Sequence, residues 1–125
     1  MQGKIVIVTA PSGAGKTTIV KHLLASEPKL AFSVSATTRT KRNMETDGKD
    51  YYFLSVEQFN EKINQHAFVE WEEVYPGKLY GTLNSEVERI WSNNQHIIFD
   101  VDVKGALSLK NKYPEQTISL FIQPP

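Results

Sequence analysis

A short apolar run that leads directly into a glycine-rich segment constrains this chain more than any other feature. Residues 5–8 are the β-branched sequence Ile-Val-Ile-Val, which favours a strand buried on both faces of a parallel sheet. Beyond residues 10–17, apolar residues recur at helical spacing from Ile19 to Leu24, and the pattern stops before Pro28. The sequence therefore predicts a strand, a loop and a helix, in that order.

The glycine-rich segment reads Ala-Pro-Ser-Gly-Ala-Gly-Lys-Thr over residues 10–17. Between a strand and a helix, this spacing is typical of a P-loop, whose backbone N–H groups and helix start bind phosphate oxygens. Lys16 is expected to bridge the β- and γ-phosphates of ATP, and the hydroxyl of Thr17 to bind Mg²⁺. The usual first glycine is Ala10 here, which fits if that position does not need a positive φ. The predicted ATP-binding residues are Ala10, Pro11, Ser12, Gly13, Ala14, Gly15, Lys16, Thr17 and Thr18.

A second acidic element follows an apolar run late in the chain. Asp100 lies near the end of a predicted buried strand over residues 97–101, where a P-loop protein carries the aspartate that organises Mg²⁺. Asp102 follows two residues later, and the alternative is that one of the two caps the helix predicted over residues 103–112. We assign the metal to Thr17 and Asp100.

The remaining patterns predict further strands over residues 32–35 and 118–122, and a mixed region between the first and last core segments. In that region, residues 51–54 are aromatic and strand-like, and Ser55 with Gln58 forms a capping box for a helix with an inward face of Val56, Phe59 and Ile63. Residues 68–75 and 78–82 flank Pro76-Gly77, which predicts two strands joined by a tight turn. Ser85 with Glu88 predicts another capped helix, whose inward residues are Val87, Ile90 and Trp91.

These elements predict an α/β fold: the three-layer fold of the P-loop NTPases, with a parallel core sheet and an inserted mixed α+β region. The expected divisions are residues 1–36 for the core with the P-loop, 37–84 for the insertion and 85–125 for the return to the core.

Composition excludes several classes of protein. Apolar residues make up 40% and charged residues 22% of the 125 residues, as in an ordinary globular domain. Lys and Arg equal Asp and Glu at 14 each, which argues against a broad nucleic-acid surface. There is no cysteine, so disulfides and thiolate metal sites are excluded. The first apolar run is too short for a signal peptide or membrane span, so we expect a cytoplasmic protein without membrane or nucleic-acid partners.

Several motifs in the insertion and after it, taken in order behind a P-loop, resemble the guanylate kinase family over essentially the whole chain. They are SATTRTKR at residues 35–42, GKDY at 48–51, FVEW at 68–71, YGT at 80–82 and IFDVDVKG at 98–105. Each motif is weak alone, and together they are highly specific.

The resemblance implies a GMP site with a distinct role for each residue. Arg39 and Arg42 would hold the GMP phosphate, which two guanidinium groups suit, and Tyr51 and Tyr80 would add hydroxyl donors. Without the resemblance, the two arginines would be interpreted as a solvated basic loop.

The implied reader of the base is Glu70, whose carboxylate accepts the adjacent N1–H and N2–H₂ donors of guanine, whereas adenine offers an acceptor at N1. Ser35 and Thr82 would contact the base near O6, and Asp102 its amino edge. From the alternation alone, Glu70 and Glu72 are equally well interpreted as the solvated face of a strand.

The implied reaction is transfer of the ATP γ-phosphoryl group to GMP, with Mg²⁺ on the ATP phosphates and Lys16, Arg39 and Arg42 as catalytic residues. A non-catalytic interaction module of guanylate kinase type and another P-loop kinase for a small acceptor are the alternatives. The intact Gly15-Lys16-Thr17 argues against the first, and Glu70 against the second. Members of the family continue for several dozen residues that include a lid with arginines, so we expect the 125-residue form to be poorly active.

Overall fold

The computed structural model of the protein describes residues 3–9, 16–99 and 103–121. Contacts within the chain divide it into two units, Met1–Ser33 with Val87–Pro125 and, separately, Val34–Glu86. Within the described ranges, no helix combines the length and apolar character needed to cross a bilayer.

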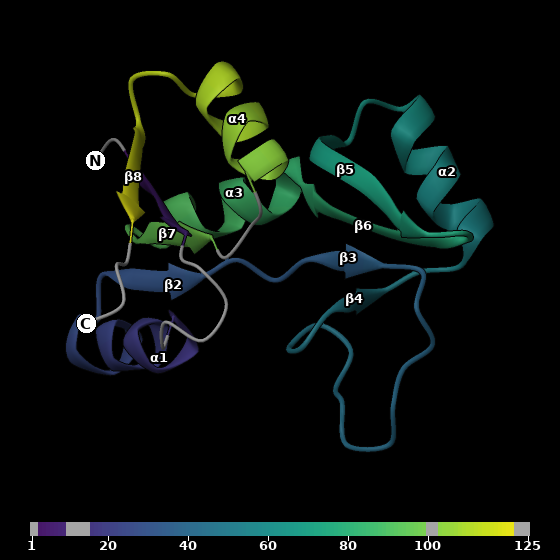
Figure 1. The fold of residues 1–125 in the computed structure, drawn as a ribbon, viewed down its shortest axis with the longest axis horizontal. Coiled ribbons are helices and arrows are strands. Elements are labelled where there is room, and N and C mark those ends of the chain that lie inside the picture. Colours follow the sequence, from purple (N-terminus) through teal and green to yellow (C-terminus); the bar gives the residue numbers. More distant parts are fainter. Residues whose placement is uncertain (1–2, 10–15, 100–102, 122–125) are drawn as a thin grey trace. The chain divides into compact units, whose positions relative to one another are not determined.

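The first unit is built on a parallel sheet (Figure 1). Its strands run in the order β2-β7-β1-β8, and every neighbouring pair is parallel, which confirms the predicted parallel core. Helix α3 begins in the second unit and ends in the first. The elements are β1 (Ile5–Thr9), α1 (Lys16–Ser26), β2 (Leu30–Phe32), α3 (Asn84–Ser92), β7 (His96–Phe99), α4 (Val103–Lys112) and β8 (Thr117–Phe121).

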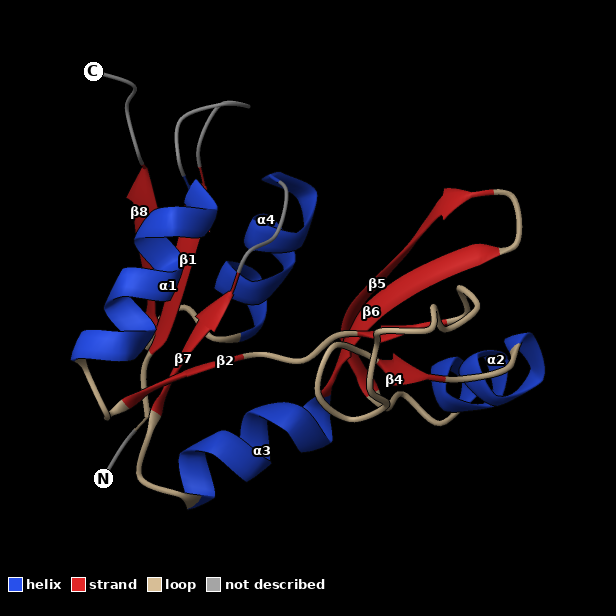
Figure 2. Ribbon diagram, turned by 90° about the horizontal axis from the view of Figure 1, so that it is seen from below, coloured by secondary structure: helices blue, strands red, loops and turns tan. Residues whose placement is uncertain are grey.

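Both faces of the central strand β1 are covered, as its continuous apolar sequence predicts. Val8 packs with Val20 of α1 and Ile98 of β7 in one cluster. Ile5 and Ile7 alternate with Val8, so they point to the other face, and they are fully buried as well. Figures 1 and 2 show α1 and α4 on opposite faces of this sheet.

The second unit contains a smaller mixed sheet with strand order β4-β3-β6-β5 (Figure 1). Strands β3 and β4 are parallel, whereas β6 is antiparallel to both β3 and β5. The turn at Pro76-Gly77 joins β5 to β6, with Gly77 at a φ of 77°, which confirms the predicted hairpin. The elements are β3 (Ala36–Thr37), β4 (Tyr52–Phe53), α2 (Val56–Asn64), β5 (Phe68–Tyr75) and β6 (Lys78–Leu83).

Helix α2 begins with the predicted capping box, in which the Ser55 hydroxyl accepts from the Gln58 N–H and the Gln58 side chain accepts from the Ser55 N–H. Phe59 is fully buried and stacks on Phe68 of β5, with the ring centroids 4.4 Å apart. Val56 is 42% exposed, so its predicted inward position is wrong. As the first residue of the helix, it lies at the edge of this contact.

Two predicted boundaries are also wrong. The strand expected over residues 32–35 is replaced by β2, which ends at Phe32, because the pairing with β7 runs from Leu30 to Phe32. The chain then leaves the first unit, and β3 starts at Ala36 in the second.

Helix α3 begins at Asn84, so Ser85 lies inside the helix and does not cap it. The physical reason is that Asn84 is held from outside the helix: its backbone N–H donates to the Ala67 carbonyl and its side chain donates to the His66 carbonyl. Val87 and Ile90 are buried as predicted, and Trp91 is half-buried.

Candidate functional site

One face of the small sheet is covered by an apolar cluster and the other carries polar residues of the predicted GMP site. The cluster consists of Ala36, Phe59, Phe68, Leu79 and Leu83. On the hairpin, Glu70 pairs with Thr82 and Glu72 with Tyr80, and residues directly opposite each other share a face. Leu79 and Leu83 alternate with Tyr80 and Thr82 along β6, so the polar side chains point away from the cluster.

A β-bulge near Val69 places Glu70 on the polar face. Phe68 pairs with Leu83 and Glu70 pairs with Thr82, so β5 advances by two residues where β6 advances by one. In a regular strand Phe68 and Glu70 would share a face, because they are two residues apart. The bulge separates them, with Phe68 in the apolar cluster and Glu70 on the opposite side.

Glu70 is held by its cross-strand partner. The hydroxyl of Thr82, which is fully buried, donates to Oε1 of Glu70 over 2.9 Å. The backbones of β5 and β6 approach each other so closely here that a Cβ at Gly81 would lie 2.7 Å from the Glu70 carbonyl oxygen. Glycine at position 81 is therefore a requirement of this close approach.

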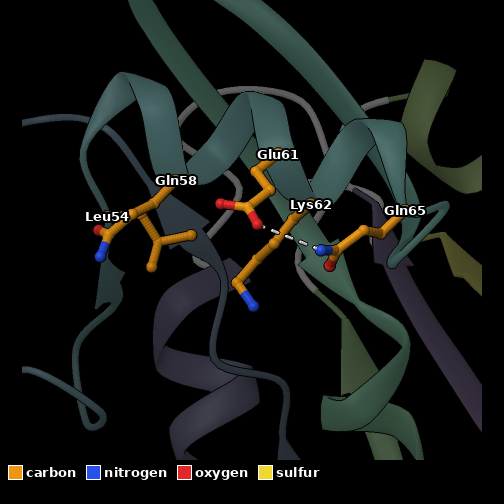
Figure 3. Close-up of a pocket in the computed structure, with 5 residues that line it drawn as sticks. All are labelled: Leu54, Gln58, Glu61, Lys62 and Gln65. Carbon is orange, nitrogen blue, oxygen red and sulfur yellow. Dashed lines mark hydrogen bonds between the residues drawn. The ribbon is translucent and has the colours of Figure 1, made fainter.

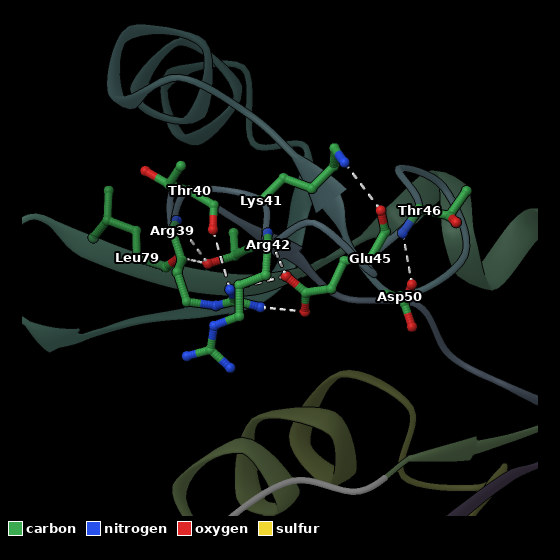
Figure 4. A network of polar contacts seen from close by, with 9 residues as sticks. Arg39, Thr40, Lys41, Arg42, Glu45, Thr46, Asp50 and Leu79 are labelled. Atoms are coloured by element: carbon green, nitrogen blue, oxygen red, sulfur yellow. Dashed lines mark hydrogen bonds and ion pairs between the residues drawn. The ribbon is translucent and has the colours of Figure 1, made fainter.

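Arg39 is fixed by a bidentate ion pair with Glu45, drawn in Figure 4. Nη1 lies 3.0 Å from Oε1 and Nη2 lies 2.6 Å from Oε2. The same guanidinium lies over the rings of Tyr51 and Phe53, at 5.1 and 5.8 Å from their centroids. Hydrogen bonding to the Glu45 carboxylate raises the pKa of Arg39, although burial opposes the shift. The planar group is thus oriented by a carboxylate on one side and aromatic rings on another.

Glu45 also organises the rest of this loop. Its Oε1 accepts the backbone N–H of Arg42 over 2.9 Å, and its carbonyl accepts the ammonium group of Lys41 over 3.1 Å. Among the described residues, the Arg42 guanidinium has no hydrogen-bond partner (Figure 4). Glu45 has no role that the sequence predicts, because its ion pair with Arg39 spans six residues of an irregular loop.

The rings of Tyr51 and Tyr80 contact each other, with centroids 6.2 Å apart in an edge-on arrangement. Tyr80 and Thr82 lie two residues apart on β6 and share a face, so the aromatic pair and the Glu70 contact belong to the same surface. The carbonyl of Ser35 accepts the N–H of Tyr52, which places Ser35 beside β4.

The predicted ATP site is described only in part. Strand β1 ends at Thr9 and α1 begins at Lys16, so residues 10–15 lie in sequence between the carboxyl end of a parallel strand and the start of a helix. Lys16, Thr17 and Thr18 are the first residues of α1. The other predicted ATP-binding residues, Ala10, Pro11, Ser12, Gly13, Ala14 and Gly15, lie outside the described residues. So do the predicted metal ligand Asp100, which directly follows β7, and the predicted GMP contact Asp102.

A hollow of about 290 Å³ lies elsewhere, on α2 (Figure 3). It contains none of the residues predicted to bind nucleotide. Its lining mixes opposite charges with amides, and the Gln65 side chain donates to Glu61 over 3.4 Å. The lining residues are Leu54, Gln58, Glu61, Lys62 and Gln65. We assign it no role in nucleotide binding.

The Arg39–Glu45 pair predicts a pH dependence of stability. The hydrogen bonds from Arg39 and from the Arg42 backbone lower the pKa of Glu45 from 4.5 to about 2. A lowered pKa stabilises the folded state at pH values above 4.5, and this contribution is lost as the pH falls towards 2. Urea unfolding of the parent and of Glu45→Gln should therefore differ at pH 6 and converge as the pH falls through this range. If the free energies of unfolding of the two proteins differ by the same amount at every pH, the lowered pKa of Glu45 is not the source of the stabilisation.

Comparisons with known proteins point to one family. A family model described as Guanylate kinase matches residues 2–125. The guanylate kinase of Porphyromonas gingivalis is 51% identical over 123 residues, which are 98% of this chain and 65% of that protein. The guanylate kinase of Thermotoga maritima is 45% identical over 125 residues, which are 100% of this chain and 59% of that protein.

The fold has a match among solved structures. The crystal structure of guanylate kinase from Anaplasma phagocytophilum aligns with a TM-score of 0.76 at 31% identity, over 98% of this chain and 61% of that one. The chain thus spans between 59% and 65% of the length of these proteins. Since the family model matches residues 2–125 and the fold aligns with a solved member, the chain belongs to the guanylate kinase family.

Proposed function

We propose that this protein is a guanylate kinase that transfers the γ-phosphoryl group of ATP to GMP, giving ADP and GDP. The observation that carries the proposal is the polar face of the small sheet. A half-buried carboxylate, Glu70, lies there on the same surface as Tyr80, which contacts the ring of Tyr51 beside Arg39. GMP requires an acceptor for the two adjacent donors of guanine and cations for its phosphate, and this face offers both kinds of group.

The acceptor phosphate would be bound by Arg39, Arg42, Tyr51 and Tyr80. Support comes from the contrast between the arginines: Arg39 is already oriented by Glu45, whereas the Arg42 guanidinium has no hydrogen-bond partner among the described residues. A dianionic phosphate can accept from both groups, because each guanidinium offers several N–H donors in a fixed plane.

Guanine would be read by Glu70, with Ser35 and Thr82 near O6 and Asp102 at the amino edge. The Thr82 hydroxyl donates to Oε1 of Glu70, which holds the carboxylate on the polar face of the sheet. The two oxygens of a carboxylate are the acceptors that the adjacent N1–H and N2–H₂ donors of guanine require.

The donor nucleotide would be bound by residues 10–18, with Lys16 on the β- and γ-phosphates. The phosphates would lie at the start of α1, where backbone N–H groups and the helix dipole favour anions. In the proposed reaction, an oxygen of the GMP phosphate attacks the γ-phosphorus of ATP. The bond between the γ-phosphorus and the oxygen that leaves with ADP breaks at the same time. Lys16, Arg39 and Arg42 orient the two nucleotides and offset the negative charge between them.

Mg²⁺ would be held by the Thr17 hydroxyl and the Asp100 carboxylate. Both are oxygen ligands of the kind Mg²⁺ prefers, and the ion typically completes its shell with water and substrate phosphates. When bound, it neutralises charge on the ATP phosphates. We propose a cytoplasmic location for the protein.

Calorimetric titration with GMP, AMP and ATP tests the proposal against its two alternatives. We expect binding of ATP and of GMP, with AMP weaker than GMP by roughly 10²-fold or more, since the carboxylate would face the N1 acceptor of adenine. A coupled assay of ADP release then measures transfer. Binding of neither GMP nor ATP would favour an interaction module, and equal affinity for AMP and GMP would favour another small-molecule kinase.

A further inference from the structure

Glu86 is a buried carboxylate to which the proposed reaction assigns no role. It lies in the first turn of α3, and only 1% of its surface is exposed. Its Oε2 accepts the backbone N–H of Val34 over 2.6 Å, and its Oε1 accepts the hydroxyl of Tyr52 over 2.7 Å. Glutamate is almost never buried this completely unless it is paired, so these hydrogen bonds indicate a specific task.

The hydrogen bond between Val34 and Glu86 links the two ends of the second unit. Val34 and Glu86 are the first and last residues of that unit, so the bond joins the points where the chain enters and leaves it. Val34 directly precedes Ser35, and Thr82 lies four residues before Glu86. The carboxylate therefore fixes the segments that carry two of the proposed base contacts.

The second hydrogen bond orients the proposed phosphate site. Neighbouring residues of an extended strand point to opposite sides, so Tyr52 directed at Glu86 turns Tyr51 to the other side. The ring of Tyr51 lies there, against the Arg39 guanidinium at 5.1 Å and the Tyr80 ring at 6.2 Å. Phe53, two residues from Tyr51, contacts the same ring at 5.7 Å, as the alternation requires.

We propose that Glu86 is a positioning residue for the acceptor nucleotide, acting through Val34 and Tyr52 to hold Ser35 and Tyr51 in the geometry that binds GMP. This inference rests on the proposed function. A carboxylate suits the task because two donors from different segments converge on it, and each of its oxygens accepts one. A purely structural tie would change the stability of the protein without changing the affinity of the folded protein for GMP.

The test compares GMP and ATP affinities by calorimetry in three variants and one control. Tyr52→Phe removes one hydrogen bond, and Glu86→Ala removes both. Glu86→Gln keeps the shape: its amide oxygen accepts from Val34 and its amide nitrogen donates to the Tyr52 oxygen. Glu88→Gln is the matched control, because Glu88 is an exposed glutamate two residues further along α3.

We expect Tyr52→Phe and Glu86→Ala to weaken GMP binding by about tenfold or more, the scale of a lost hydrogen bond to a charged group. ATP affinity should stay within about twofold in all variants, and Glu86→Gln should restore GMP affinity to within about threefold of the parent, because both hydrogen bonds can form. Glu88→Gln should match the parent for both nucleotides.

Equal losses of GMP and ATP affinity, or unchanged GMP affinity with a lower melting temperature, would overturn the positioning role. If Glu86→Ala does not fold, the milder Tyr52→Phe decides the question. If the parent itself does not bind GMP, the proposed function fails and the inference fails with it. Normal GMP binding by the parent and by Tyr52→Phe overturns the inference alone.

Discussion

Replacing Glu70 by glutamine should weaken GMP binding by roughly two to four orders of magnitude, the range over which sites built around hydrogen bonds discriminate. The Thr82 hydroxyl donates to Oε1 of Glu70, and in glutamine the single oxygen would stay with that donor. The amide nitrogen would then face the N1–H and N2–H₂ groups of guanine, so donors would meet donors.

The same substitution should relax the preference for GMP over AMP. Adenine presents an acceptor at N1 beside a donor at N6, and an amide can match that pair whereas a carboxylate cannot. The affinity ratio of GMP to AMP, measured by calorimetry, should therefore fall sharply in Glu70→Gln. This ratio separates a change in base recognition from a loss of folding, which would lower both affinities.

Glu72→Gln is the matched control for this experiment. Glu72 lies two residues along β5 on the same face, and it pairs with Tyr80. Its substitution tests whether any carboxylate on this face has the same effect. If Glu72→Gln and Glu70→Gln weaken GMP equally, or if neither does, Glu70 is not the guanine reader.

Local patterns in the sequence were sufficient for the elements that depend on local contacts. The strand and helix on either side of the glycine-rich segment follow from a continuous β-branched run and from the helical spacing of apolar residues. The capping box at Ser55 and Gln58 is formed by neighbours three residues apart. The hairpin follows from Pro76-Gly77, because Gly77 adopts the positive φ that the turn needs. In each of these cases the residues that determine the element are close neighbours in the sequence.

The bulge that directs Glu70 to the polar face could not be predicted from alternation. The sequence Phe-Val-Glu-Trp contains no glycine or proline at the bulge, and regular alternation would put Phe68 and Glu70 on one face. The shift becomes visible only in the pairing with β6, where Gly81 lets the backbones approach closely.

The roles of Glu45 and Glu86 were missed for related reasons. Glutamate in the first turn of a helix is usually a solvated residue that favours the dipole, so Glu86 gave no sign of burial. Its partners Val34 and Tyr52 are 52 and 34 residues away in the sequence. Glu45 meets Arg39 because an irregular loop turns back on itself, and no periodicity describes such a loop.

The second large effect is expected for Lys16→Ala, which should leave GMP affinity nearly unchanged and remove phosphoryl transfer. In the proposed site Lys16 bridges the β- and γ-phosphates of ATP, so its charge is needed most when the γ-phosphoryl group moves. A cation on the transferring group is worth roughly 10³-fold or more in rate, and a loss of that size is expected in ADP release.

The assignment of the two nucleotides to different parts of the chain makes this prediction specific. The proposed GMP residues other than Asp102 belong to the unit Val34–Glu86, whereas Lys16 begins α1 in the other unit. Lys21→Ala is the control, because Lys21 is an exposed lysine on the same helix. Calorimetry with GMP and with ATP, beside the coupled ADP assay, should show a loss confined to ATP and turnover in Lys16→Ala and no loss in Lys21→Ala. Equal weakening of both nucleotides in Lys16→Ala would mean that the lysine supports the fold as a whole, and the donor site would then have to be sought elsewhere.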